Sequence, residues 1–173
     1  QVIIRSVFDR TAFVLMRAIK IAAPAGAVVW FLANFYTGEM NLLAYCAGYL
    51  DPFARLMGLD GMILLAFILG LPANEIVLPI IIMGYLAEGA MVEFENLMTL
   101  KHLLIDNGWT LMTALSVMLF SLLHYPCATT LLTIKKETQS WKWTLLAAII
   151  PLAIGVIILI VLNLSVGMLL KMI

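Results

Sequence analysis

The chain has 173 residues, of which 64% are hydrophobic and only 12% are charged, and its mean hydropathy is +1.10. This composition excludes a water-soluble domain, and a formal net charge of zero offers no overall field for nucleic acid or for any one class of solute. The sequence holds no Ser-His-Asp set, HExxH motif or nucleotide fingerprint, so we expect no catalytic residues and no enzyme activity. The chain is predicted to be an integral membrane protein.

The predicted elements follow in chain order. Residues 1–20 place apolar side chains on one helical face and Arg and Lys on the other, which predicts an interfacial amphipathic helix. Pro24 and Gly26 then open the first apolar run. Four such runs approach the ~20 residues that one membrane span needs: 21–36, 62–86, 110–134 and 143–164. Residues 97–104 form a second amphipathic stripe, which Asn107 and Gly108 should end.

We therefore predict an all-α, polytopic membrane protein with broken or re-entrant helices and interfacial amphipathic helices. Residues 1–173 should form a single membrane domain, with broken membrane helices at 62–86 and 110–134. The chain begins with Gln1 and shows no signal-peptide pattern, so we expect it to be a fragment of a longer polypeptide.

Charge asymmetry gives a predicted orientation. The basic clusters at residues 5–20 and 135–142 should be cytoplasmic by the positive-inside rule, and the acidic stretches 39–60 and 88–106 should lie outside. Four plain crossings cannot satisfy this pattern. If residues 62–86 instead enter the membrane from the outer side and leave it on the same side, every charged cluster lies on the face of the membrane that the positive-inside rule predicts.

The first break lies inside the run 62–86, where LGLPANEIVLP occupies residues 69–79. Hydrocarbon gives freed backbone groups no partners, so a break of this kind normally lines a polar pathway. Within a helix, Pro72 would free the carbonyl of Ile68, and Pro79 that of Glu75. With the Glu75 carboxylate and the Asn74 amide, these oxygens suit a metal ion or a proton. The alternative is a kinked packing helix.

The second break, LHYPCATTL at residues 123–131, contains three residues of interest. Pro126 would free the carbonyl of Leu122. Cys127 is a potential soft ligand for a late first-row metal, and His124 could bind metal through its imidazole. The alternatives are that Cys127 is a small packing residue and that His124 is a hydrogen-bonded, helix-breaking residue. Two broken runs in one small unit indicate a transporter's substrate site.

These two segments, together with TIKKET at residues 133–138, resemble the second Gate region of bacterial ferrous iron transport protein B. The resemblance runs over nearly the whole chain and identifies Cys127 as the Gate cysteine proposed to line the iron path. Leu71 stands where Phe is expected, and Tyr125 where Trp is usual. Both changes keep an apolar or aromatic side chain.

The resemblance implies the permease part of a GTPase-linked importer in the bacterial cell membrane, with Fe²⁺ as the transported ion. Its metal-site residues would be Cys127, Glu75, Asn74 and His124. GTP and Mg²⁺ would bind only to a GTPase domain that this chain lacks, because it contains no phosphate loop. The implied partners are membrane lipid, the cytoplasmic GTPase domain of the same polypeptide, a small accessory iron-transport protein and further copies of the chain, with no nucleic acid.

Two other functions stay open at this point. A Gate-type, nucleoside-recognition-like membrane protein could use similar breaks for an organic solute, and a structural membrane subunit could use them for packing. Lys135 and Lys136 also allow two interpretations: they could dock an acidic surface of the GTPase domain, or anchor the chain at the lipid headgroups.

Overall fold

The computed structural model describes residues 2–38, 40–86 and 96–172, so part of the acidic stretch 88–106 lies outside the described residues. In chain order the elements are α1 (Val2–Asn34), β1 (Tyr36–Thr37), β2 (Met40–Asn41), α2 (Leu42–Leu56), α3 (Gly61–Leu69), the 3-10 helix η1 (Asn74–Ile76), α4 (Val77–Leu86), α5 (Leu97–Asp106), α6 (Leu111–Leu123), α7 (Ala128–Thr138) and α8 (Trp141–Met172). The predicted fold class, an all-α polytopic membrane protein with broken helices, is confirmed.

Within the part of the chain that the structure describes, three helical stretches are long and apolar enough to cross a membrane: Val14–Asn34, Leu111–Thr138 and Trp141–Met168. A fourth crossing is possible if α2 and α3 form one span, although they are bent by 106°. The helix predicted for residues 1–20 does not end before the first span. α1 runs without a break through Pro24, because a membrane helix tolerates a proline whose missing hydrogen bond is absorbed locally. The interfacial position of residues 1–20 stays a prediction.

α3 and α4 form an antiparallel hairpin with its ends tied together. The Tyr85 hydroxyl, at the end of α4, donates to the Asp60 carboxylate, which caps the start of α3. The Trp109 indole in turn donates to the Tyr85 oxygen at 2.8 Å. Because residues 60 and 85 are in contact, the run 62–86 begins and ends at the same end of the hairpin, as a re-entrant membrane segment requires.

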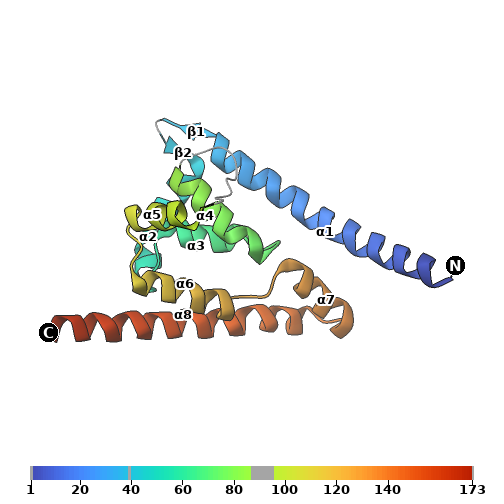
Figure 1. Cartoon of the computed structure of the whole chain (residues 1–173). Coiled ribbons are helices and arrows are strands. Elements are labelled where there is room, and N and C mark those ends of the chain that lie inside the picture. Colours follow the sequence, from blue (N-terminus) through green and yellow to red (C-terminus); the bar gives the residue numbers. More distant parts are fainter. Residues whose placement is uncertain (1, 39, 87–95, 173) are drawn as a thin grey trace.

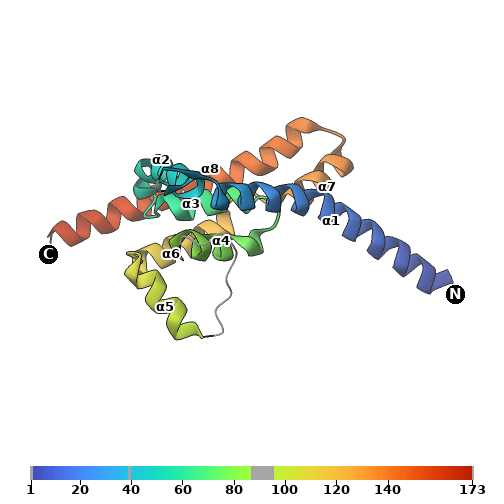
Figure 2. The same ribbon diagram turned by 90° about the horizontal axis from the view of Figure 1, so that it is seen from above.

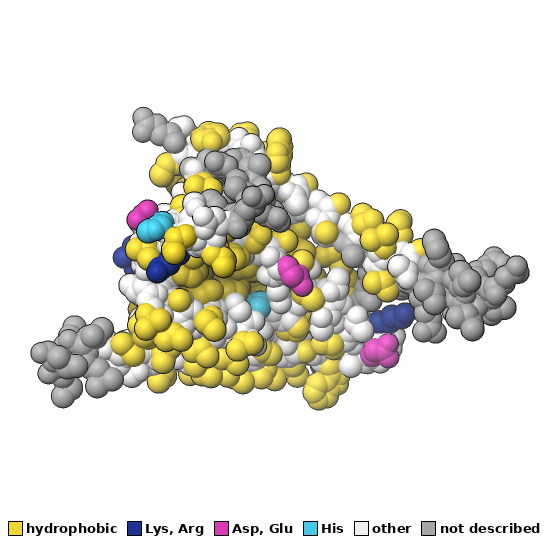
Figure 3. Space-filling view, in the orientation of Figure 1, with side chains coloured by type: hydrophobic (Ala, Val, Ile, Leu, Met, Phe, Trp, Pro, Cys, Tyr) yellow, Lys and Arg dark blue, Asp and Glu magenta, His cyan; other side chains and the backbone are white. Residues whose placement is uncertain are grey.

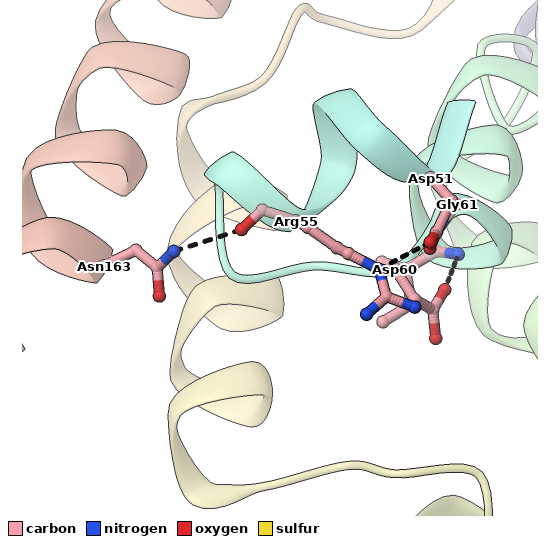
Figure 4. Close-up of polar contacts among 6 residues, drawn as sticks. Asp51, Arg55, Asp60, Gly61 and Asn163 are labelled. Carbon is pink, nitrogen blue, oxygen red and sulfur yellow. Dashed lines mark hydrogen bonds and ion pairs between the residues drawn. The ribbon is translucent and has the colours of Figure 1, made fainter. Parts of the chain in front are cut away.

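The corner between α2 and α3 is held by polar contacts (Figure 4). The Asp51 carboxylate accepts from the Arg55 side chain and, at 3.1 Å, from the Gly61 backbone N–H. The Asn163 amide of α8 donates to the Arg55 and Leu56 carbonyls at 3.1 and 3.2 Å. α8 therefore adds hydrogen bonds to two carbonyls at the C-terminal end of α2, of which that of Arg55 also accepts from the Gly58 N–H at 3.1 Å.

The core is centred on the α3–α4 hairpin, since every residue of α3 from Gly61 to Phe67 is buried. α6 packs along α8, and α7 folds back against the first part of α8 (Figures 1 and 2). In Figure 3, hydrophobic side chains spread over the middle of the face shown, and the charged groups lie toward its two ends except for one acidic side chain near the middle. This distribution suits a membrane slab lying across the long axis of α8.

The arrangement makes the topology testable. α5 lies toward the C-terminal end of α8, whereas the α7–α8 turn and the N-terminal half of α1 lie toward the other end (Figures 1 and 2). Cysteines introduced at Lys101 and at Lys136, both exposed, should therefore react with an impermeant maleimide from opposite faces of the membrane. Labelling of both from one face would contradict the re-entrant hairpin.

Candidate functional site

The first break is the tip of the α3–α4 hairpin, at residues 70–76. α3 ends at Leu69, Gly70 caps it, and Pro72 lies in the connection that follows. The tip is tight: a Cβ on Gly70 would lie 2.4 Å from the Val77 side chain and 3.0 Å from the Ala66 carbonyl. Asn74 and Glu75 follow in η1 with exposed side chains. The break thus presents a carboxylate and an amide at the end of an apolar hairpin.

The second break separates α6 from α7 at residues 124–127. α6 ends where His124 turns to an extended conformation with ψ 176°, and α7 begins after Cys127, its N-cap, with ψ 158°. Pro126 between them suits this extended stretch, because the residue before a proline disfavours the helical conformation. The two half-helices still count together as one membrane span.

Two hydrogen bonds join the breaks. The Ala128 N–H, in the first turn of α7, donates to the Leu71 carbonyl at 2.8 Å. The Tyr125 hydroxyl donates to the Phe67 carbonyl of α3. Segments more than fifty residues apart therefore meet where both helices are interrupted, and each supplies the polar partner that the other lacks in hydrocarbon.

The predicted carbonyl pattern needs correction. Pro72 and Pro126 lie in connections between helices, not inside them, so neither displaces a hydrogen bond four residues back within a helix. The Ile68 carbonyl accepts from the Leu71 N–H at 3.4 Å, and the carbonyl oxygens that accept across the site are those of Phe67 and Leu71. The cause is the early end of α3, three residues before Pro72.

His124 is buried, with 7% of its surface exposed, and packs edge-on against Phe67 and Tyr125. Its Nδ1 lies 3.0 Å from both the Phe120 and Ser121 carbonyl oxygens. Carbonyls only accept, so in the neutral imidazole Nδ1 carries the proton and Nε2 keeps a lone pair. Nε2 has no hydrogen-bond partner in the described structure. A histidine held in this way is arranged as a metal ligand is, with its far nitrogen fixed by a backbone carbonyl.

Cys127 is half-buried, and its Sγ lies 3.1 Å from the Thr129 Oγ1 and 3.2 Å from the Thr130 Oγ1. Both hydroxyls belong to the first turn of α7, where backbone N–H groups also point toward the N-cap. If each hydroxyl donates to the sulfur, the arrangement stabilises negative charge on Cys127. This is the environment in which a thiol becomes a metal ligand.

The four residues proposed from the sequence fall into two pairs. Cys127 and His124 lie in the second break, and Asn74 and Glu75 lie at the hairpin tip. Within the described residues, no three His, Cys, Asp or Glu side chains come close enough to hold a metal ion. The contacts described above join the breaks through the carbonyls of Phe67 and Leu71. A complete coordination shell would need backbone oxygens, water, or ligands from elsewhere.

The connecting role of Tyr125 was not predicted from the sequence. Tyr125 was noted only as an aromatic residue in place of the usual Trp, yet its hydroxyl donates to the Phe67 carbonyl and so joins the second break to α3. A signal was present, because a tyrosine deep in an apolar run needs a partner for its hydroxyl. The sequence could not say which carbonyl that partner would be.

The fold and site define a class: a polytopic membrane protein in which two interrupted helices meet at an apolar core. The Gate family model, described as nucleoside recognition, matches residues 15–141, and the chain belongs to this family.

The curated relatives carry one name. The chain is 27% identical over 177 positions, 94% of its length, to the Fe(2+) transporter FeoB of Methanocaldococcus jannaschii, of which it covers 25%. It is 50% identical over 48 residues, 28% of its length, to the Fe(2+) transporter FeoB of Staphylococcus aureus strain MSSA476, of which that match covers 7%. No solved structure matches the chain significantly. The predicted resemblance to the ferrous iron transporters is confirmed, and the chain is a multi-pass cell-membrane protein.

Proposed function

We propose that this chain forms part of the ion path of a ferrous iron importer, acting as a single membrane domain over residues 1–173. The observation that carries the proposal is the junction of the two breaks through Ala128–Leu71 and Tyr125–Phe67. It places a half-buried thiol and a buried imidazole beside interrupted backbone. The names of the relatives support Fe²⁺ as the transported ion.

The proposed ligands suit a borderline divalent cation. Imidazole and thiolate favour late first-row metals over Mg²⁺ and Ca²⁺, whereas carboxylate and amide oxygens favour harder ions. We assign the Cys127 sulfur and the His124 Nε2 to selection of Fe²⁺ in the second break. Glu75 and Asn74, exposed at the hairpin tip, attract the hydrated cation and exchange its water for oxygen ligands. The chain contributes no catalytic residue to this process.

Energy supply and partners belong to the same proposal. The chain spans only a quarter of the length of the Methanocaldococcus relative. We assign GTP and Mg²⁺ binding to a cytoplasmic GTPase domain in another part of a longer polypeptide. A small accessory iron-transport protein and further copies of the chain are the remaining proposed partners.

An organic solute is the second candidate, since the family description names nucleoside recognition. The discriminating measurement is binding to the purified transporter in the presence and absence of Fe(II). Metal-independent binding of a nucleoside, without iron uptake, would favour this alternative over the ion path.

The bare Nε2 of His124 gives the sharpest test of the proposed path. An asparagine can place its amide N–H near the position of Nδ1 and keep the bonds to Phe120 and Ser121, but it has no atom at the position of Nε2. In the full-length transporter, His124→Asn should lower the initial rate of Fe(II) uptake at least about tenfold if Nε2 binds the ion. Uptake is measured per transporter molecule in the membrane.

The matched control is His102→Asn, because His102 lies exposed on α5. It should leave uptake unchanged. If His124→Asn retains the uptake rate of the wild type, His124 is a hydrogen-bonded helix-ending residue and not part of the path.

A further inference from the structure

An apolar groove lies between α7 and the first part of α8. Its volume is about 290 Å³. One polar member of its lining, Thr144, already donates its hydroxyl to the Ser140 carbonyl at 3.0 Å. The remaining lining is apolar except for Lys135. The lining residues are Ala128, Leu131, Leu132, Lys135, Trp141, Thr144, Leu145 and Ala148.

The groove has one basic end. The Lys135 Nζ lies 3.6 Å from the centre of the Trp141 ring, at the turn where α7 passes into α8. Lys142 does not line the groove but is exposed nearby in the chain, in the first turn of α8, and the acidic Glu137 is exposed in the last turn of α7. The Lys135 carbonyl accepts from the Gln139 N–H at 3.0 Å, so the turn is closed by its own backbone.

The groove is also long enough to hold part of a lipid acyl chain. From Lys135 to Ala128, α7 rises about 10 Å along its axis, at 1.5 Å per residue. If the lysines lie at the headgroups, as the positive-inside rule predicts, the groove extends from the interface toward the middle of a ~30 Å core. Leu132, Trp141 and Leu145, which line the groove, have exposed side chains.

We propose that this groove binds one acyl chain of an anionic phospholipid from the cytoplasmic leaflet, with the phosphate group held by Lys135 and Lys142. Three features point to this occupant: the apolar lining, the positive charge at one end only, and an aromatic ring at the level where headgroups lie. A zwitterionic lipid offers the same chain without the net charge. An acidic protein surface would match the lysines and leave the apolar groove unfilled.

The test measures lipid binding to the full-length transporter by native mass spectrometry, with phosphatidylglycerol and phosphatidylcholine of identical acyl chains. The wild type should bind the first phosphatidylglycerol several-fold more tightly than phosphatidylcholine. Lys135→Gln should weaken phosphatidylglycerol binding about fivefold and leave phosphatidylcholine binding unchanged. Lys101→Gln, on exposed α5 at the other end of the molecule, is the matched control and should change neither.

A second variant separates the groove from the charge. Ala148→Phe fills the lining and should weaken binding of both lipids at this site with every lysine in place. Equal affinity of the wild type for the two lipids would overturn the proposal, and so would unchanged phosphatidylglycerol binding in Lys135→Gln. If Lys135→Gln binds lipid normally but loses GTP-dependent iron uptake, Lys135 serves the GTPase domain. Displacement of the lipid by millimolar inorganic phosphate would show headgroup binding without the groove, which also contradicts the proposal.

Discussion

Replacement of Cys127 by alanine should lower the initial rate of Fe(II) uptake at least about tenfold in the full-length transporter, at unchanged abundance in the membrane. The reason is local. The Cys127 sulfur stands at the start of α7, with two threonine hydroxyls within 3.2 Å, in the break that is joined to the α3–α4 tip. Alanine keeps the N-cap backbone and removes the soft ligand. Glu75→Gln, at the hairpin tip, should also lower the rate, because it removes the negative charge that attracts the cation.

The control for the first prediction is Cys46→Ala. Cys46 is the other free thiol, is also half-buried, and lies in α2, which neither break includes. Its removal should leave uptake unchanged. If Cys127→Ala and Glu75→Gln both transport iron at the wild-type rate, the two breaks do not form the ion path and the proposed function is wrong.

Gly61→Ala should destabilise the folded protein by about 3 kcal/mol or more, the upper range for overpacking a core. A Cβ at Gly61 would lie 1.9 Å from the Ala47 carbonyl oxygen, 2.8 Å from the Ala47 carbonyl carbon and 2.9 Å from the Asp51 backbone nitrogen. All three atoms are backbone of α2, so no side chain can turn away to make room. The α2–α3 corner of Figure 4 would have to open, and the hydrogen bond from Gly61 to Asp51 would be lost.

The measurements for Gly61→Ala are the yield of monodisperse protein after solubilisation and its midpoint of thermal unfolding in detergent. Gly48→Ala is the matched control, since Gly48 lies in α2, the helix that Gly61 of α3 packs against, and a Cβ at Gly48 meets nothing within 4 Å. Alanine is also the better helix former by about 1 kcal/mol, so this variant should be as stable as the wild type or more stable. Equal stability of the two variants would mean that α2 and α3 do not cross so closely.

Much of the architecture could be predicted from the sequence because it depends on local chemistry. Proline and glycine both disfavour a continuous helix, so the breaks near Pro72 and Pro126 could be predicted from the sequence. The end of α5 at Asn107 and Gly108 follows from the same kind of signal, with Gly108 at φ 85°. The hydrophobic runs identified a membrane protein, and charge asymmetry favoured a hairpin over residues 62–86.

The effect of each proline was not predictable in the same way. The sequence located Pro72 but could not show that α3 ends before it, and the expected free carbonyl of Ile68 therefore finds a local partner. At Pro24 the prediction was wrong in the opposite way: the sequence suggested that a new helix begins there, but α1 continues through it. Whether a proline ends a helix or is absorbed by it depends on packing along the rest of that helix.

What the sequence by itself determined is the kind of protein and the places where its helices are interrupted, since apolar composition and backbone-breaking residues act over a few positions. Only the tertiary structure decided which interrupted segments meet. The bonds from Ala128 to Leu71 and from Tyr125 to Phe67 join residues more than fifty positions apart, and the Asp60–Tyr85 contact closes the hairpin across twenty-five. In an apolar interior each freed backbone group takes whichever donor the fold brings to it, and that choice depends on the packing of whole helices.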